Sequence, residues 1–100
     1  MIGLQIKTNI NKIKSKALPI LKEAGVKRSA IFGSSARGDS SPTSDVDFLI
    51  DLPKEKTLFE FVDLKLKLQD ALKKRVDLVE YQRINPAIKK QVLQERIAIL

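Results

Sequence analysis

The sequence contains no cysteine and no histidine. The absence of cysteine excludes disulfides and thiolate metal sites. The absence of histidine excludes the Ser-His-Asp triad, the usual imidazole base and the commonest ligand of zinc. Any chemistry must therefore come from carboxylates, hydroxyls, amines, guanidinium groups and the backbone, and carboxylate oxygens are ligands that magnesium prefers.

Aromatic residues and long apolar runs are also scarce. Only 5% of the residues are aromatic, and no apolar run approaches the length of a membrane span or forms a signal peptide. We therefore expect a soluble, cytoplasmic protein. The 100 residues, of which 43% are hydrophobic, suffice for a single domain, 1–100, around one modest core. A large acceptor would have to dock from outside.

The formal net charge of +7 favours acidic partners such as nucleotides, nucleic acids or acidic protein surfaces. Solvated helix faces are a simpler explanation for most of the lysines. No basic run is as long as a nucleic-acid-binding tail, and the few aromatic residues offer little surface for stacking on bases. Nucleic acid is therefore a possible partner that the sequence does not favour.

The pattern of apolar residues predicts a small α/β (α+β) domain. Helical patterns cover 8–24, 57–73 and a last segment from 86, and strand patterns cover 26–32, 44–52 and 75–80. We expect Pro19 to kink or split the first helix. Thr57 and Glu60 form a capping-box pattern for the second, and Asn85 should cap the last, with Pro86 at its first position. The result is a three-stranded mixed sheet flanked by helices.

Apolar residues at helical spacing predict which helix faces are buried. They are Leu58, Phe61, Val62, Leu64, Leu68, Ala71 and Leu72 in the second long helix, and Ile88, Val92, Leu93 and Ile97 in the last. We expect all of them to pack toward the sheet.

A glycine-serine turn, Gly33-Ser34, follows the first strand pattern. A backbone that approaches a phosphate closely needs a residue without a Cβ, and a serine hydroxyl can donate to a phosphate oxygen. The free N–H groups of a short helix after the turn would face the same anion. Alone, the turn is also typical of an ordinary strand-to-helix connection, and it is neither a Walker loop nor a dinucleotide fingerprint.

Two aspartates, Asp45 and Asp47, open the second strand pattern. Because strand side chains alternate, both project to one face, where they repel each other unless a cation lies between them. Magnesium binds such oxygen ligands and keeps sites for substrate phosphates. A chance Asp-x-Asp at a solvated strand edge is the alternative, but aspartate is disfavoured in strands.

A third carboxylate, Asp77, lies at the centre of an apolar strand pattern, 75–79. An acid that is buried among apolar neighbours needs a partner or a role. If this strand lies beside the one that Asp45 and Asp47 open, the three carboxylates converge and could hold two metal ions.

The spacing of these residues resembles the signature of the DNA polymerase beta-type nucleotidyltransferases. The pattern consists of Gly33-Ser34-x-Ala36-Arg37-Gly38, a gap of six residues, and Asp45-x-Asp47. Asp77 stands where that family carries its third acid. The length of the chain makes the resemblance closest to the minimal nucleotidyltransferases (MNT), and it extends over almost the whole chain. Ser35 departs from relatives that frequently carry arginine.

The resemblance implies a role for each matching acid and for the turn. Asp45, Asp47 and Asp77 would be the catalytic residues and the ligands of two Mg²⁺ ions, with Asp77 also the base. Gly33 and Ser34 would hold the β- and γ-phosphates of a nucleoside triphosphate.

Arg37 would bind the nucleotide as well, through a phosphate. A salt bridge to Asp39 or Asp45 is an equally good interpretation of this arginine. Tyr81, the only tyrosine, could stack on a base, but a half-buried packing role is the better interpretation.

The resemblance also implies a function. Minimal nucleotidyltransferases commonly act as antitoxins that transfer AMP from ATP to a tyrosine of a HEPN-domain toxin and bind that toxin. We therefore expect a magnesium-dependent nucleotidyltransferase with ATP as substrate and a HEPN-domain protein as partner. The alternatives are a non-catalytic antitoxin module that only binds its partner, and a nucleotidyltransferase that acts on RNA or a small molecule.

Overall fold

The computed structural model describes residues 2–38 and 45–100, with side chains from residue 9 onward. The elements follow in the order α1 (Ile2–Glu23), β1 (Arg28–Phe32), α2 (Ser34–Arg37), β2 (Val46–Asp51), α3 (Leu58–Leu72), β3 (Val76–Glu80), the 3-10 helix η1 (Tyr81–Arg83), α4 (Lys89–Glu95) and β4 (Ile97–Ala98). The order in the sheet is β3-β2-β1-β4, with only the β2–β3 pair parallel. The expected α/β class with a mixed sheet is confirmed.

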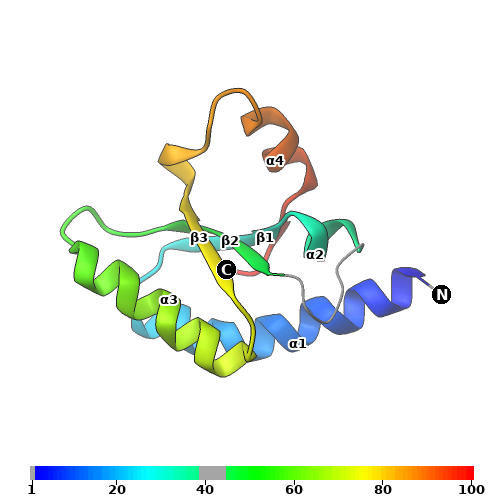
Figure 1. The fold of residues 1–100 in the computed structure, drawn as a ribbon, viewed down its shortest axis with the longest axis horizontal. Coiled ribbons are helices and arrows are strands. Elements are labelled where there is room, and N and C mark those ends of the chain that lie inside the picture. Colours follow the sequence, from blue (N-terminus) through cyan, green and yellow to red (C-terminus); the bar gives the residue numbers. More distant parts are fainter. Residues whose placement is uncertain (1, 39–44) are drawn as a thin grey trace.

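Helices cover both faces of this sheet (Figure 1). On one face, side chains of β2 such as Phe48 and Ile50 share a core cluster with Leu21 of α1 and Leu68 of α3. On the other face, Leu49 packs in a second cluster with residues of η1 and α4. Because strand side chains alternate, the odd-numbered positions of β2 face α4.

The prediction of three strands was wrong, because β4 makes a fourth. Ile97 and Ala98 pair with Ile31 and Ala30 of β1. The last helix therefore ends at Glu95, and Ile97 packs from a strand rather than from a helix. A segment of two residues is too short to show a periodic pattern of apolar residues in the sequence. Ile97 and Ala98 form a strand because they pair with β1.

Pro19 does not split α1, which runs without a break from Ile2 to Glu23. A proline removes the hydrogen bond to the carbonyl four residues earlier, here that of Ser15. Pro19 and Ser15 are both exposed, so water can satisfy that carbonyl. No helix in the described part of the chain combines the length and apolar character needed to cross a membrane.

Asn85 does not cap the last helix. Its side-chain oxygen accepts a hydrogen bond from the Ala87 N–H at 3.0 Å, which closes a turn, and α4 starts only at Lys89. Ile88 is consequently 49% exposed rather than buried, whereas Val92 is buried as expected.

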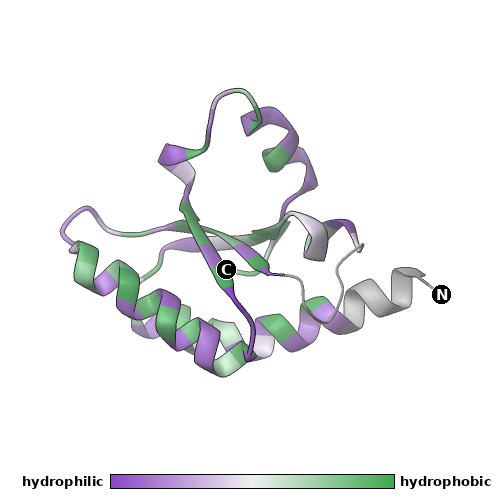
Figure 2. Cartoon of the chain, viewed as in Figure 1, coloured by the Kyte–Doolittle hydropathy of each residue, from purple (hydrophilic) through white to green (hydrophobic). Residues whose placement is uncertain are grey.

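The start of α3 is confirmed, but its buried face is narrower than predicted. The Glu60 N–H donates to the Thr57 hydroxyl at 3.3 Å and the Thr57 N–H to the Glu60 carboxylate at 3.0 Å, a complete capping box. Leu64 and Leu68 are buried, as expected. Leu58 and Val62 were predicted to be buried but are exposed, and apolar residues recur along the whole helix (Figure 2).

Candidate active site

The two central aspartates lie side by side on the parallel strands. Asp47 of β2 is the register partner of Asp77 of β3, and neighbouring strands lie about 4.8 Å apart. Asp45 immediately precedes β2 and is exposed, whereas Asp47 is half-buried. The condition on which the convergence of the carboxylates depended, that the Asp77 strand lies beside the Asp47 strand, is therefore met.

The three carboxylates interact with one another electrostatically. Burial raises the pKa of Asp47 above its ordinary value, and the negative charges of Asp77 and Asp45 raise it further. The positive charge of Arg37 acts in the opposite direction but is the smallest influence. The site thus concentrates negative charge that its one nearby arginine does not neutralise.

Asp77 is not buried among apolar neighbours, contrary to the sequence-based interpretation. Val76 is buried, but Leu78 and Val79 are half-buried and Asp77 itself is exposed. The reason is that β3 is the outer strand of the sheet. Asp77 therefore carries no desolvation penalty that would demand a role, and its interest comes from its register with Asp47.

Gly33 lies directly against the Asp47 carboxylate. The residue before it, Phe32, is the register partner of Asp47 on the antiparallel side. Gly33 has φ 73° and ψ −149°, a combination that only glycine adopts without strain. A Cβ at this position would overlap the Oδ2 atom of Asp47 and lie 3.3 Å from its Cγ. This glycine is therefore required by the aspartate as well as by the turn, and it joins the two halves of the motif.

The turn leads directly into the short helix α2, which starts at Ser34. The Gly33 carbonyl accepts hydrogen bonds from the N–H groups of Ala36 and Arg37 at 3.1 and 3.0 Å. Ser34 is half-buried and Ser35 is buried. The N–H groups of Ser34 and Ser35, at the very start of the helix, are those that a helix leaves without an acceptor of its own. Asp39, one of the two acids considered as a partner of Arg37, lies outside the described residues.

Arg37 contacts an acid that the sequence did not indicate. Its Nη1 atom lies 3.4 Å from the Oε2 atom of Glu95 in α4. The other Glu95 oxygen accepts a hydrogen bond from Gln91 at 3.3 Å. Nothing in the sequence connects Arg37 to a residue 58 positions away, so Glu95 could be found only from the fold.

The donor set fits magnesium in chemistry but is not assembled as a metal site. All three acids offer hard carboxylate oxygens, and the repulsion that raises the pKa of Asp47 is what a cation would relieve. Within residues 9–38 and 45–100, however, no group of three acidic side chains is arranged to hold a metal ion. Asp45 and Asp77 are exposed, so rotation of their side chains could bring them to a shared ion.

Two other residues, Asp51 and Tyr81, fall outside the site. Asp51, at the far end of β2, pairs with Arg28 at 3.4 Å. Tyr81 is only 9% exposed, with the Arg28 guanidinium 4.0 Å from its ring centre and that of Arg96 at 5.9 Å. Tyr81 therefore has a packing role between two arginines.

The architecture around these aspartates is that of a minimal nucleotidyltransferase. A solved structure described as a candidate protein of that class superposes with a TM-score of 0.77 at 34% identity, covering 92% of this chain and 93% of the other. A crystal structure of a toxin–antitoxin pair with AMP-PNP superposes with a TM-score of 0.75 at 22% identity, covering 87% and 72%. At that identity, the second likeness shows the fold alone.

The chain belongs to the nucleotidyltransferase domain family, whose family model matches residues 14–99. One relative, from Methanocaldococcus jannaschii, is named as a candidate protein adenylyltransferase and is 45% identical over 92% of this chain and 99% of its own length. Another is the protein adenylyltransferase MntA of Thermococcus cleftensis, 37% identical over 75% of this chain and 76% of its own. The resemblance found in the sequence is thereby confirmed, and the chain is a nucleotidyltransferase.

Proposed function

We propose that this chain transfers AMP from ATP to a tyrosine hydroxyl of a HEPN-domain toxin, in a magnesium-dependent reaction, and acts as its antitoxin. The observation that carries the proposal is the register of Asp47 with Asp77, beside a glycine turn that fits closely against Asp47. The names of relatives support the acceptor class, since they are called protein adenylyltransferases. Solved neighbours named as MntA–HepT toxin–antitoxin crystal structures support a toxin as the partner.

In this proposal the carboxylates hold two magnesium ions. Asp45 and Asp47 would bind both ions, and Asp77 would ligate one of them. Bound magnesium would supply positive charge to the triphosphate and lower the pKa of the attacking hydroxyl. The raised pKa of Asp47 supports this assignment, because uncompensated negative charge favours a cation.

The turn and the arginine would hold the triphosphate. The Ser34 hydroxyl and the N–H groups at the start of α2 would donate to the β- and γ-phosphates, and Gly33 would let the backbone approach them. Arg37, within electrostatic range of Asp47, would meet a phosphate oxygen. These groups would orient the α-phosphorus toward solvent and the acceptor.

The reaction needs an acceptor hydroxyl in line with the leaving pyrophosphate. The hydroxyl oxygen would attack the α-phosphorus, the bond to the bridging oxygen would break, and the proton would pass to Asp77. Asp77 is exposed, so a hydroxyl on the surface of another protein can reach it. The protein then contributes mainly positioning and electrostatic stabilisation.

The test is transfer of label from α-labelled ATP to the HEPN-domain protein of the same organism. The wild-type chain with magnesium should label it, and Asp45→Ala combined with Asp47→Ala should abolish labelling. Asp51→Ala, on the same strand but paired with Arg28, is the matched control and should retain activity. Equal labelling by the double variant and the wild type would refute the proposal, while labelling of RNA or a small molecule instead would change the acceptor.

A second candidate is a module that neutralises its partner by contact alone. It is favoured by one observation, that no three described acids are already arranged around a metal position. The two candidates differ in nucleotide binding, because a ligand that binds the folded state raises Tm. A rise in Tm with ATP and magnesium together supports the enzyme, and no shift at millimolar ATP supports the contact module.

A further inference from the structure

Exposed apolar side chains are concentrated on one helix. Among residues 9–38 and 45–100, the exposed large hydrophobic residues are Leu58 (76%), Phe59 (87%), Val62 (44%) and Leu66 (55%) on α3, and Ile88 (49%). We name the four on α3 the α3 stripe. Such residues are normal when they are scattered singly, but a contiguous group marks an interaction surface.

The α3 stripe runs along a side of α3 that does not pack into the hydrophobic core. Leu58, Val62 and Leu66 are spaced four residues apart, so their side chains lie above one another. Leu64 and Leu68, which are buried, take the side toward the sheet. A helix with apolar residues on both sides is expected to be buried on both, so the stripe is a face that no described side chain of this protein covers.

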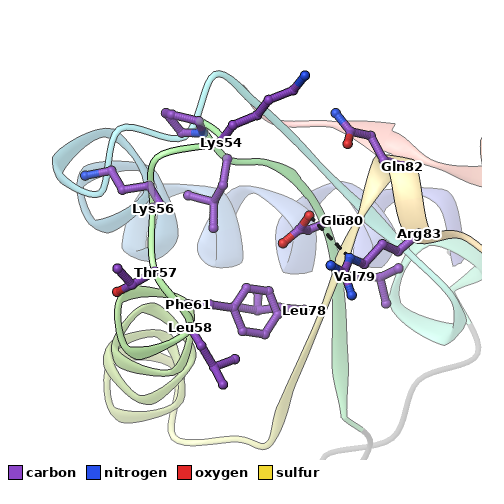
Figure 3. Close-up of a pocket in the computed structure, with 12 residues that line it drawn as sticks. Lys54, Lys56, Thr57, Leu58, Phe61, Leu78, Val79, Glu80, Gln82 and Arg83 are labelled. Carbon is purple, nitrogen blue, oxygen red and sulfur yellow. Dashed lines mark ion pairs between the residues drawn. The ribbon is translucent and has the colours of Figure 1, made fainter.

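The stripe continues into a groove of about 540 Å³ at the edge of the sheet. The groove lies between the start of α3, the connection from β2, and strand β3 with η1 (Figure 3). Leu58 belongs to both the stripe and the groove, and Phe61 and Leu78 line the groove beside it. Stripe and groove therefore form one continuous surface, which is apolar along α3 and has both apolar and polar residues in the groove.

The groove borders the free edge of β3. This strand is at one end of the sheet, with no described strand beyond it. At its start, the Val76 N–H donates to the Gln69 side chain at 3.2 Å instead of to a strand. Alternate backbone groups of a strand point to the same side, so those of Leu78 and Glu80 face the groove and can pair with another protein.

The charged residues of the groove are mainly basic. Lys54, Lys56 and Arg83 line it against a single acid, Glu80, which lies 3.8 Å from Arg83. Two copies of this chain would bring these like charges together across a shared interface, which is unfavourable. A protein with acidic side chains around an apolar contact would be complementary in both respects.

The groove also reaches the face of the sheet that carries the candidate site. Leu78 packs with the α1–α3 cluster, whereas Val79 packs with the cluster on the α4 side, and both line the groove. Asp77 shares the α4 side with Val79 because strand residues alternate. The two residues lie about 7 Å apart along the strand, so a protein in the groove has its own surface next to Asp77.

We propose that the α3 stripe and this groove dock the acceptor protein, a partner with an apolar surface rimmed by acidic side chains, and so hold its hydroxyl near Asp77. This rests on the proposed function for the identity of the acceptor. The docking itself is independent of catalysis, because none of the stripe residues belongs to the candidate site.

The test measures the binding of the purified HEPN-domain protein of the same organism by calorimetry and, separately, its labelling. Leu58→Ser with Val62→Ser should weaken binding about tenfold or more, since truncating central apolar contacts has that scale of effect. The Tm shift with ATP and magnesium should not change. Ile88→Ser, which removes an exposed apolar residue away from the stripe, is the matched control and should bind like the wild type.

A second pair of variants tests the charge of the groove. Lys54→Glu with Lys56→Glu should weaken binding, and wild-type binding should weaken as salt is raised. Lys89→Glu with Lys90→Glu makes the same change of charge on α4 and should have little effect. These substitutions of lysines leave the apolar side chains of α3 in place, so they also cover the case in which the serine variants fail to fold.

Three results would overturn the docking proposal. The first is wild-type affinity in both the serine and the charge variants. The second is a wild-type chain that does not bind the HEPN-domain protein at all. The third is a wild-type dimer in sedimentation that Leu58→Ser with Val62→Ser converts to a monomer, because a second copy then covers the stripe. Binding without labelling would instead refute the proposed reaction and leave the docking surface standing.

Discussion

The carboxylate site brings acidic side chains close together, whereas the α3 stripe exposes apolar side chains to solvent, and neither arrangement stabilises the fold. At the site, burial and the neighbouring acids Asp77 and Asp45 raise the pKa of Asp47. On α3, apolar side chains as large as Phe59 face solvent. Each arrangement is unfavourable for the isolated chain, and each would be relieved by a different ligand, a cation in one case and a protein in the other.

The difference lies in how each surface is held. Asp47 is fixed by sheet register on two sides, by Phe32 of β1 and by Asp77 of β3. The α3 stripe needs only a helix and its capping box. The site should therefore be sensitive to small changes of geometry, and the stripe should tolerate polar substitution. Substitutions at the carboxylate site test whether it is sensitive to small changes of geometry and charge.

The largest effect is expected from Asp47→Asn. Loss of a metal-ligating and charge-bearing group should lower the transfer rate by about 10³-fold or more. The same change should raise Tm at neutral pH, because it removes a carboxylate that burial and two neighbouring acids penalise. Single-turnover labelling and calorimetric melting measure the two effects. A variant that is both inactive and less stable would show that Asp47 is held by favourable contacts instead.

The pH dependence of stability should show whether the Asp47 carboxylate stabilises or destabilises the fold. The folded protein binds the Asp47 proton more tightly than the unfolded chain, since the pKa is raised from 3.8. Asp47 is thus least unfavourable below 3.8 and destabilises the fold progressively as pH rises through the folded-state pKa. Tm measured against pH should therefore fall less steeply over that window in Asp47→Asn. Magnesium should raise Tm of the wild type more than that of the variant, and chelation should reverse this.

A smaller effect is expected from Gly33→Ala, with Gly25→Ala as its matched control. Both glycines have positive φ, 73° and 79°, but a Cβ at Gly25 meets only the flexible Lys56 side chain at 3.5 Å. Gly25→Ala should cost about 1–2 kcal/mol of unfolding free energy, and Gly33→Ala about 2–4 kcal/mol, because overlap with Asp47 is added. Urea denaturation measures both values.

A double-mutant cycle tests whether the extra cost of Gly33→Ala over Gly25→Ala comes from the overlap with Asp47. In an Asp47→Ala background the carboxylate that Gly33 faces is gone, so the cost of Gly33→Ala should fall toward that of Gly25→Ala. An unchanged cost would mean that the backbone conformation alone requires the glycine. The contact between the two halves of the motif would then be incidental.

Much of the site could be predicted because its signals are local. The Asp45-x-Asp47 spacing places both acids at the start of one strand, although β2 itself begins at Val46, and the Gly33-Ser34 turn is marked by residue type. The helix between their strands is compatible with a parallel pair, but the register of Asp77 with Asp47 was found only from the fold.

The rest depends on contacts between distant segments. The strand β4 exists only because Ile97 and Ala98 pair with β1. Apolar spacing in α3 could not distinguish the buried Leu64 from the exposed Leu58, because the period of a helix does not say which side the protein covers. Exposure of Asp77 likewise follows from the place of β3 at the edge of the sheet.

The smallest effect is expected from Glu95→Ala, which tests whether the site extends to α4. Glu95 lies 3.4 Å from Arg37 and is itself held by Gln91, so its loss should leave the guanidinium less ordered for a phosphate. We expect KM for ATP to rise roughly two- to fivefold with kcat unchanged, the scale of an exposed ion pair.

Glu55→Ala, which removes an exposed acid in the turn before α3, controls for the change of net charge. An equal rise in KM for both variants would assign the effect to overall charge. A fall in KM for Glu95→Ala would show that Glu95 competes with the nucleotide for Arg37. A rise confined to Glu95→Ala would place α4 in the support of the nucleotide site, while the α3 stripe on the opposite side serves the acceptor.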